Sequence, residues 1–171
     1  AELAESHEFL QATHKMMSKK GMPDRELVCR YFAFRLLRPF FDTTETMDDF
    51  LDKGMDALSA LPENDFERET ARFKTVMQRC YDVLGDITFI NIKATRKRIN
   101  KNLFDAFSYT ISRLNDNEYQ SLLRQSDRLE EEYKRLFEEK GFLCGKELRK
   151  TSTDAVRKRF DTMDRFIRKF T

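Results

Sequence analysis

The chain has 171 residues, of which 40% are hydrophobic and 36% are charged, and its formal net charge is +2. It contains only five Gly and three Pro residues, and its mean hydropathy is −0.69. This composition can supply one domain with a hydrophobic core, and it favours long helices over a β-sandwich or barrel. No stretch approaches the ~18–20 apolar residues of a membrane span, so no membrane partner is expected.

The N-terminal residues and the cysteine spacing both indicate a cytoplasmic protein. Residues 1–5 lack both the basic region and the apolar stretch of a signal peptide, and they contain no Met. We therefore expect a fragment, or the C-terminal half, of a longer protein. Cys29, Cys80 and Cys144 are odd in number and widely spaced, unlike a zinc site or a disulfide framework. Inert thiols in a reducing, cytoplasmic compartment are the simplest interpretation.

Two helices are predicted in the first forty residues. The first covers residues 2–19 and stops at Gly21, and the second begins at Pro23 and ends at Pro39. Apolar residues cover most of the circumference of the second helix, which predicts a central place in the core. These apolar residues are Leu27, Val28, Tyr31, Phe32, Phe34, Leu36 and Leu37.

Capping residues mark the next two helices. Thr46 can cap a third helix that has acidic residues in its first turn. Asn64 and Glu67 resemble a capping box at the start of a fourth helix, for which Gly85 is the predicted stop. The inward face of the fourth helix is predicted to contain Phe66, Ala71, Phe73, Met77 and Tyr81.

The segment 87–92 is the only β-branched cluster in the chain. Because a single strand has no evident partner, an extended connector or a helical turn is predicted there. A fifth helix follows, and a sixth covers residues 117–140, with a break expected near Ser126 and a loop bounded by Gly141 and Gly145. The apolar face of the fifth helix is predicted to contain Ile99, Leu103, Phe104, Phe107 and Ile111.

The last helix has the clearest pattern, starting near Thr151 and Asp154. Its apolar residues are spaced 4, 3, 4 and 3, which predicts a helix that faces the core. A coiled-coil dimer needs ~3–4 heptads, and this run supplies only two. The apolar residues are Val156, Phe160, Met163, Ile167 and Phe170. The predicted fold class is therefore all-α, a single multi-helix bundle of about seven helices spanning residues 1–171.

No catalytic motif is present in the chain. His7 and His14 share a helix face but would lie ~10 Å apart along it, too far to chelate one ion, so no metal site is expected. No glycine-rich phosphate loop occurs, and the paired carboxylates resemble first-turn and surface charges. We therefore predict no catalytic residue and no cofactor for this chain.

Basic runs are the best candidates for contact with phosphate. Five cations lie within nine residues at the predicted start of the fifth helix, where side chains and free N–H groups could meet a DNA backbone. They are Lys93, Arg96, Lys97, Arg98 and Lys101. A second, weaker patch consists of Arg157, Lys158 and Arg159. The alternatives are a solvated basic face or a partner for segment 42–70, which has ten acidic and two basic residues.

Several blocks resemble a known family. Met22–Phe34 is similar to the "R-M-x-D-R-E-L-V-L-R-F-L-A-F" stretch of GmrSD-type proteins, which have a ParB/sulfiredoxin-like N-terminal domain. Met47–Leu51 resembles the family's "M-D-D-F-L-N", and Ile99–Ala106 resembles "I-N-K-A-L-F-E-A". Residues 3–9 and 151–160 also resemble family segments in the same order, so the resemblance spans nearly the whole chain.

The resemblance implies a parent protein in antiphage defence or modification-dependent restriction. Its upstream domain would hydrolyse nucleotides with a D-G-Q-Q-R motif, and some relatives add an HNH nuclease, but neither motif occurs here. The chain would then be an accessory helical domain whose partners are that upstream domain and DNA. Arg25, Arg30 and Arg35 are candidates for contact with the missing core domain or its nucleotide. A purely structural or oligomerisation module is the alternative.

Overall fold

The computed structural model describes residues 2–16, 23–37, 45–138, 150 and 152–171, and this part of the chain is helical without a β-strand. It contains two short 3₁₀-helices and eight α-helices, seven of which have seven or more residues. The prediction of an all-α bundle of about seven helices is confirmed. The elements are η1 (Glu2–Glu5), α1 (His7–Ala12), α2 (Pro23–Leu37), α3 (Met47–Ser59), α4 (Glu63–Leu84), η2 (Gly85–Ile87), α5 (Lys101–Ser112), α6 (Asp116–Arg124), α7 (Ser126–Leu136) and α8 (Thr153–Ile167).

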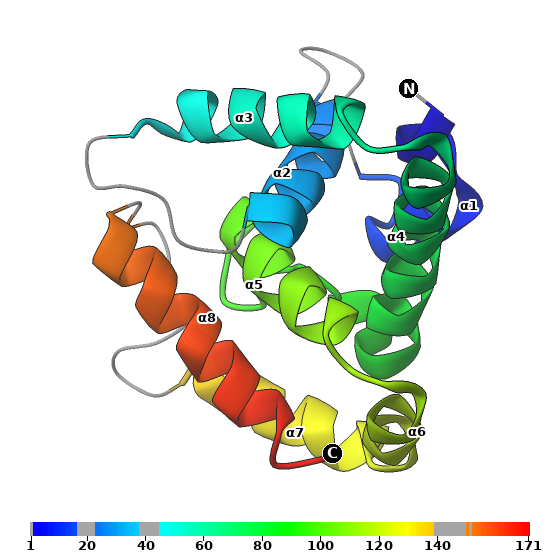
Figure 1. The fold of residues 1–171 in the computed structure, drawn as a ribbon. Coiled ribbons are helices and arrows are strands. Elements are labelled where there is room, and N and C mark those ends of the chain that lie inside the picture. Colours follow the sequence, from blue (N-terminus) through cyan, green and yellow to red (C-terminus); the bar gives the residue numbers. More distant parts are fainter. Residues whose placement is uncertain (1, 17–22, 38–44, 139–149, 151) are drawn as a thin grey trace.

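Helix α5 occupies the middle of the bundle. It packs against α2, α4 and α8, while α3 lies across α2 and the pair α6–α7 closes one end (Figure 1). The predicted central helix, α2, contributes six buried residues, but α5 buries eight. Three of these eight residues are polar, and a polar side chain gives no sign in the sequence that it is buried. Thr110 satisfies its hydroxyl by donating to the Ala106 carbonyl at 2.9 Å, which lets it lie in the core. The others are Asp105 and Ser108.

Aromatic rings connect the helices through the core. The Phe73 ring of α4 lies 5.9 Å from that of Phe9, 5.0 Å from that of Tyr31 and 5.8 Å from that of Phe32. Such pairs contribute about 0.5–1.5 kcal/mol beyond the burial of their area. With 16 Phe and no Trp in the chain, these phenyl rings are the main large side chains of the interior.

A buried ion pair joins α2 to α5. Arg30 is 5% exposed and Asp105 is 2% exposed, and the guanidinium donates from Nε to Oδ1 at 3.0 Å and from Nη2 to Oδ2 at 2.5 Å. Burial alone would lower the pKa of the Arg30 guanidinium, but the charge and hydrogen bonds of Asp105 hold that pKa above its ordinary value. The Arg30 guanidinium is therefore charged in the folded protein, and its bidentate contact with Asp105 offsets the cost of burying it.

A close approach of α2 and α3 depends on a glycine. A Cβ atom built on Gly54 would overlap the side chain of Ala33 and would lie 2.5 Å from its Cα. The missing side chain lets the two helices pack backbone against backbone. This contact explains why α3 contains a residue that normally weakens a helix by about 1 kcal/mol relative to Ala.

Several predicted helix ends are confirmed. The Thr46 hydroxyl accepts from the Asp49 N–H at 3.2 Å while the Asp49 carboxylate accepts from the Thr46 N–H at 3.2 Å, which is a capping box. Gly85 ends α4 with a φ of 49°. The predicted break near Ser126 occurs at Gln125, between α6 and α7. The apolar stripe of α8 is buried, as predicted, and faces the core.

The prediction of one helix over residues 2–19 is wrong. The chain forms η1 and then α1, which begins after Ser6 and ends at Ala12. The Ser6 hydroxyl accepts from the Phe9 N–H at 3.4 Å and so restarts the helix. His14 and Lys15 have φ values of 55° and 53°, so the backbone turns into the left-handed region and cannot continue the helix.

The predicted capping box at Asn64 is also wrong. Helix α4 starts at Glu63, one residue earlier, with Pro62 at the N-cap position and no side-chain cap. Of the predicted inward residues, Phe66 and Ala71 are exposed, and the helix instead buries Glu69 and Val76. The buried face of α4, which packs against α1, α5 and α7, is therefore only partly the predicted one, since Phe73 and Met77 are buried as expected.

The segment 87–92 is a connector, as predicted. It contains the end of η2, a turn and a single antiparallel bridge between Ile90 and Ile99. No described helix is long and apolar enough to cross a membrane. Predictions at some positions lie outside the described residues; these are Lys19, Gly21, Pro39, Lys140, Gly141, Cys144, Gly145 and Thr151.

Replacing Asp105 by Ala should destabilise the protein by about 3–5 kcal/mol, because the buried Arg30 guanidinium would lose its compensating charge. The double variant Arg30→Met/Asp105→Leu should recover much of this loss, since it removes both charges. Urea denaturation measures the free energy of unfolding of each variant. Asp65→Ala is the control, because its exposed pair with Arg68 should contribute at most about 1 kcal/mol. An Asp105→Ala variant as stable as this control would contradict the role of the pair.

Gly54→Ala should destabilise the protein by about 1–3 kcal/mol, although Ala is the better helix former, because the added methyl group forces α2 and α3 apart. Thermal unfolding followed by circular dichroism measures the effect. Asp52→Ala, at an exposed position of the same helix, is the control and should change stability little. A Gly54→Ala variant more stable than the wild type would show that the two helices separate at no cost.

Candidate functional site

The first predicted site, the basic run, lies on a loop with anchored ends. Ile90 and Ile99 form the bridge at its base, and the Asn100 N–H donates to the Phe89 carbonyl at 2.8 Å. Phe89 is fully buried, and its ring lies 4.8 Å from that of Phe104. It adopts a φ of 59°, an uncommon conformation for a bulky residue, which the surrounding core maintains. We refer to residues 91–98 as the basic loop.

Three of the predicted cations extend from the basic loop into solvent. Arg96, Lys97 and Arg98 are exposed, and the described part of the chain shows no carboxylate paired with them. Lys93 pairs with Glu138 at 3.4 Å, and Lys101 pairs with Glu26 at 2.5 Å. Neither partner belongs to the acidic segment 42–70, so these two ion pairs do not support that alternative.

The backbone N–H groups at the start of α5 contribute less to phosphate binding than the sequence predicted. Helix α5 begins at Lys101, after most of the basic run rather than within it. The Asn100 side chain accepts from the N–H groups of Asn102 and Leu103 at 3.0 and 3.1 Å. These two donors are therefore occupied by the cap, and phosphate contact at this end of α5 depends on side chains.

The second predicted patch does not form one surface. Arg159 is 3% exposed and donates to the Lys150 carbonyl at 2.7 Å, and burial lowers the pKa of its guanidinium. Arg157 is exposed and lies 3.8 Å from Asp154, and Lys158 is exposed. Because Arg159 lies in the core, only Arg157 and Lys158 face solvent.

The three arginines that were predicted to contact an upstream domain do not share one surface. Arg25 is exposed, Arg30 is buried against Asp105, and Arg35 is half-buried with its Nε 3.4 Å from a Glu69 oxygen. Residues five apart on a helix differ by roughly 140° around its axis, so this spacing cannot place three side chains on one face. Of the three, Arg25 alone is an exposed side chain.

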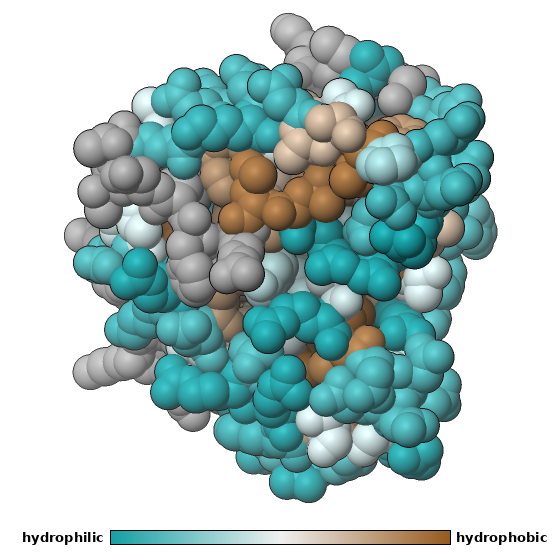
Figure 2. All heavy atoms as spheres, in the orientation of Figure 1, coloured by the Kyte–Doolittle hydropathy of each residue, from teal (hydrophilic) through white to brown (hydrophobic). Residues whose placement is uncertain are grey.

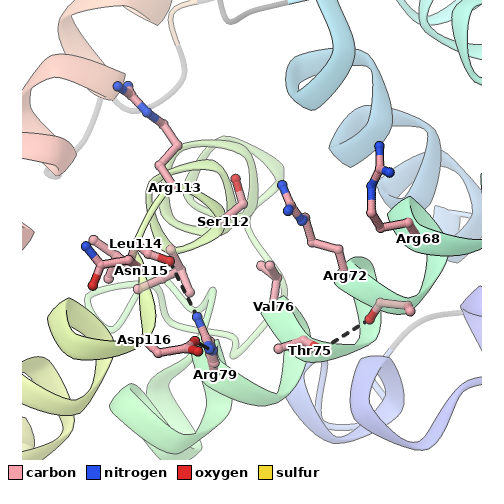
Figure 3. A pocket seen from close by; sticks show the side chains of 12 residues that line it. Arg68, Arg72, Thr75, Val76, Arg79, Ser112, Arg113, Leu114, Asn115 and Asp116 are labelled. Carbon is pink, nitrogen blue, oxygen red and sulfur yellow. Dashed lines mark hydrogen bonds and ion pairs between the residues drawn. The ribbon is translucent and has the colours of Figure 1, made fainter. Parts of the chain in front are cut away.

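The structure also shows a pocket that the sequence interpretation missed. It has a volume of about 570 Å³ and lies between α4 and the C-terminal end of α5 (Figure 3). Arg68, Arg72 and Arg79 line it from α4, and Arg113 lines it from the residue that follows α5. We call it the arginine pocket. The spacing of Arg68, Arg72, Thr75 and Arg79 is 4, 3 and 4, a one-face helical pattern that the sequence offered.

Aromatic rings and a helix start orient two of these arginines. The Arg79 guanidinium lies over the Tyr119 ring at 4.4 Å and pairs with Asp116 at the start of α6. It also donates to the Leu114 carbonyl at 3.5 Å. The Arg113 guanidinium lies 5.6 Å from the centre of the Tyr109 ring. Stacking on a ring face leaves the N–H edge of a guanidinium directed outward.

A network beside the pocket joins α4 to α6. The Tyr119 hydroxyl donates to Asp82 at 2.9 Å, and burial together with this hydrogen bond raises the pKa of Tyr119 to about 12. Asn115 and Glu118 form a capping box at the start of α6, with bonds of 2.9 and 2.8 Å. Hydrogen bonding to the Asn115 N–H lowers the pKa of Glu118. These contacts hold Asn115 and Asp116 at the rim of the arginine pocket.

The groups that usually perform catalysis are scattered or buried. The described residues contain no group of three His, Cys, Asp or Glu side chains that could hold a metal ion. His14 Nε2 lies 3.1 Å from the Thr88 carbonyl, a contact that attaches the end of α1 to the connector after α4. Cys80 is fully buried, and burial raises the pKa of its thiol well above the ordinary value.

Comparison with protein-family models, with curated proteins and with solved structures found no match to this chain.

The thiol of Cys80 should react with iodoacetamide at pH 8 at least about 100-fold more slowly in the folded protein than in 6 M urea, because reaction requires opening of the core. Mass spectrometry of peptides taken over time measures the rate. Cys29, which is half-buried, is the internal comparison and should react faster than Cys80. Equal rates for Cys80 in the folded and unfolded protein would contradict an inert, buried thiol.

Proposed function

We propose that this chain is a non-catalytic helical domain that contacts the DNA backbone through the basic loop. The observation that carries the proposal is the exposed trio Arg96, Lys97 and Arg98 on a loop whose ends are anchored. A loop held at Ile90 and Ile99 presents its cations with less conformational freedom to lose on binding. Such contacts would be sequence-independent, because phosphates carry no base information.

The family resemblance supports a parent protein of the modification-dependent restriction or antiphage type. In that setting the domain would support an upstream nucleotide-hydrolysing domain and position DNA for it. Arg25 is the exposed arginine of α2 that could contact such a partner. The buried or half-buried thiols of Cys80 and Cys29 fit a reducing, cytoplasmic setting.

The alternative is a structural or oligomerisation module, and one observation favours it. Phe66 is 42% exposed and lies at a second hollow of about 650 Å³ between η1, α2, α3 and α4. An exposed phenyl ring at an apolar hollow is a common feature of association surfaces. Sedimentation velocity across a hundredfold range of concentration separates the possibilities, since a monomer at every concentration removes the oligomer version.

The triple variant Arg96→Gln/Lys97→Gln/Arg98→Gln should bind a 20-base-pair duplex at least about tenfold more weakly at 50 mM salt, because up to three phosphate contacts are lost. Fluorescence anisotropy measures the affinity at several salt concentrations. The slope of log K against log salt should become shallower by about 2–3 for the same reason.

The matched control is Arg124→Gln/Arg165→Gln/Lys169→Gln, which removes the same charge from exposed positions of α6, of α8 and of the end of α8, outside both predicted basic patches. It should change the slope by less than about 1 if these positions make no phosphate contact. Equal slopes for the wild type and the loop variant, or equal losses in both variants, would contradict a DNA contact at the basic loop.

A further inference from the structure

The arginine pocket concentrates positive charge in one hollow. Four arginines line it, against a single carboxylate, Asp116, which is already paired with Arg79. In the region between α4 and α5, Figure 2 shows hydrophilic atoms beside a smaller hydrophobic patch. The basic loop precedes α5, whereas the pocket lies at the other end of this helix, about 17 Å away along its axis. The pocket is therefore a separate feature from the proposed DNA contact.

The arginines of the pocket retain capacity to bind an anion. The nearest Glu69 oxygen lies 3.9 Å from Arg72, too far for a hydrogen bond, and Glu69 also faces Arg35 at 3.4 Å. Glu69 is 7% exposed, and its Oε2 and the Arg35 Nε are buried without a hydrogen-bond partner. The Glu69 carboxylate thus lies between the guanidinium groups of Arg35 and Arg72 and forms a hydrogen bond with neither.

The outer arginines are held only by weak contacts. Arg68 pairs with Asp65 one turn away at 2.9 Å, and its side chain is 64% exposed. Exposed pairs of this kind contribute at most about 1 kcal/mol, so a ligand can replace the carboxylate. Arg113 is exposed, and its guanidinium lies over the face of the Tyr109 ring. Arg68, Arg72 and Arg113 therefore keep guanidinium N–H groups that an anion in the pocket could accept from.

The rest of the lining indicates which kind of anion fits. The Thr75 and Ser112 hydroxyls donate to carbonyls of their own helices at 3.2 and 2.7 Å, so the arginines are the main donors. The lining residues include no aromatic ring, so a nucleobase would find no stacking partner. Arg68 and Arg79 are eleven residues apart, about 16 Å along α4, which is farther than one phosphate group can span.

We propose that the arginine pocket binds a small oligophosphate, recognising the phosphate chain itself rather than the group that carries it. Guanidinium groups bind phosphate oxygens through paired N–H donors, and several of them match the several charges of an oligophosphate. The pocket volume of about 570 Å³ is within the usual range for small-ligand sites. Arg79, fixed by Asp116 and Tyr119, forms the rigid end of the pocket, and Arg72 lies on the same helix face. The Arg113 side chain points away from the arginines of α4 in Figure 3, so it reaches the ligand by a change of rotamer.

Isothermal titration calorimetry at 20 mM salt with sodium tripolyphosphate, with ATP and with inorganic phosphate tests the proposal on the full chain. Tripolyphosphate and ATP should bind with similar affinity, and inorganic phosphate should bind at least about tenfold more weakly because it meets fewer arginines. Arg72→Gln/Arg113→Gln should weaken tripolyphosphate binding at least about tenfold. The affinity of Arg72→Lys/Arg113→Lys for tripolyphosphate should lie between those of the wild type and the glutamine variant, because lysine keeps the charge but lacks the paired N–H donors.

Lys74→Gln is the matched control, since Lys74 is an exposed cation of α4 that lies outside the arginine pocket. Its affinity for tripolyphosphate should stay within about twofold of the wild type, because the substitution removes only a distant positive charge that salt screens. Circular dichroism and the thermal midpoint of the Arg72 and Arg113 variants confirm that these exposed substitutions leave the fold intact.

Three results would overturn the proposal. They are the absence of tripolyphosphate binding, binding of ATP alone, and an equal loss of affinity in the Lys74→Gln control. If tripolyphosphate does not bind and the pocket variant loses affinity for DNA, the pocket is assigned to a nucleic-acid backbone instead. The loop variant Arg96→Gln/Lys97→Gln/Arg98→Gln should bind tripolyphosphate like the wild type, so the pocket and the DNA contact can fail separately.

Discussion

The buried pair between Arg30 and Asp105 is the interaction on which the arrangement of the other helices depends. Removing two charges from water costs several kcal/mol each, and only close, bidentate geometry can offset that cost. The 3.0 and 2.5 Å hydrogen bonds therefore restrict α2 to one register on α5. Because α5 also packs against α4 and α8, this register positions the helices that form the surface.

Both candidate binding regions are attached to this fixed helix. At its start, the Asn100 cap and the buried Phe89 hold the base of the basic loop, and Lys101 pairs with Glu26 of α2. At its end, Arg113 lines the arginine pocket together with three arginines of α4. A rigid helix with a cationic feature at each end can hold two anionic ligands at a constant separation. The two proposals are thus linked by geometry, although each rests on different residues.

Arginine serves distinct purposes in this molecule, and its surroundings determine which. Arg30 is an internal ion-pair partner, Arg159 donates to a backbone carbonyl in the core, and Arg79 stacks on Tyr119. Arg96 and Arg98, by contrast, extend into solvent. Grouping Arg157, Lys158 and Arg159 as one patch fails for this reason, since consecutive helical residues point about 100° apart and one of the three faces inward.

Local chemistry was readable from the sequence alone. The scarcity of Gly and Pro, the Thr46 cap, the Gly85 stop and the stripe of α8 each depend on neighbouring residues, and they predicted an all-α fold and several helix ends. The cationic trio of the basic loop was readable for the same reason. Only the tertiary structure decided that α5 rather than α2 lies at the centre, that Arg30 is buried against a residue 75 positions away, and that Arg113 joins three arginines of α4. Burial and pairing between distant segments depend on how helices pack, and no local pattern specifies that packing.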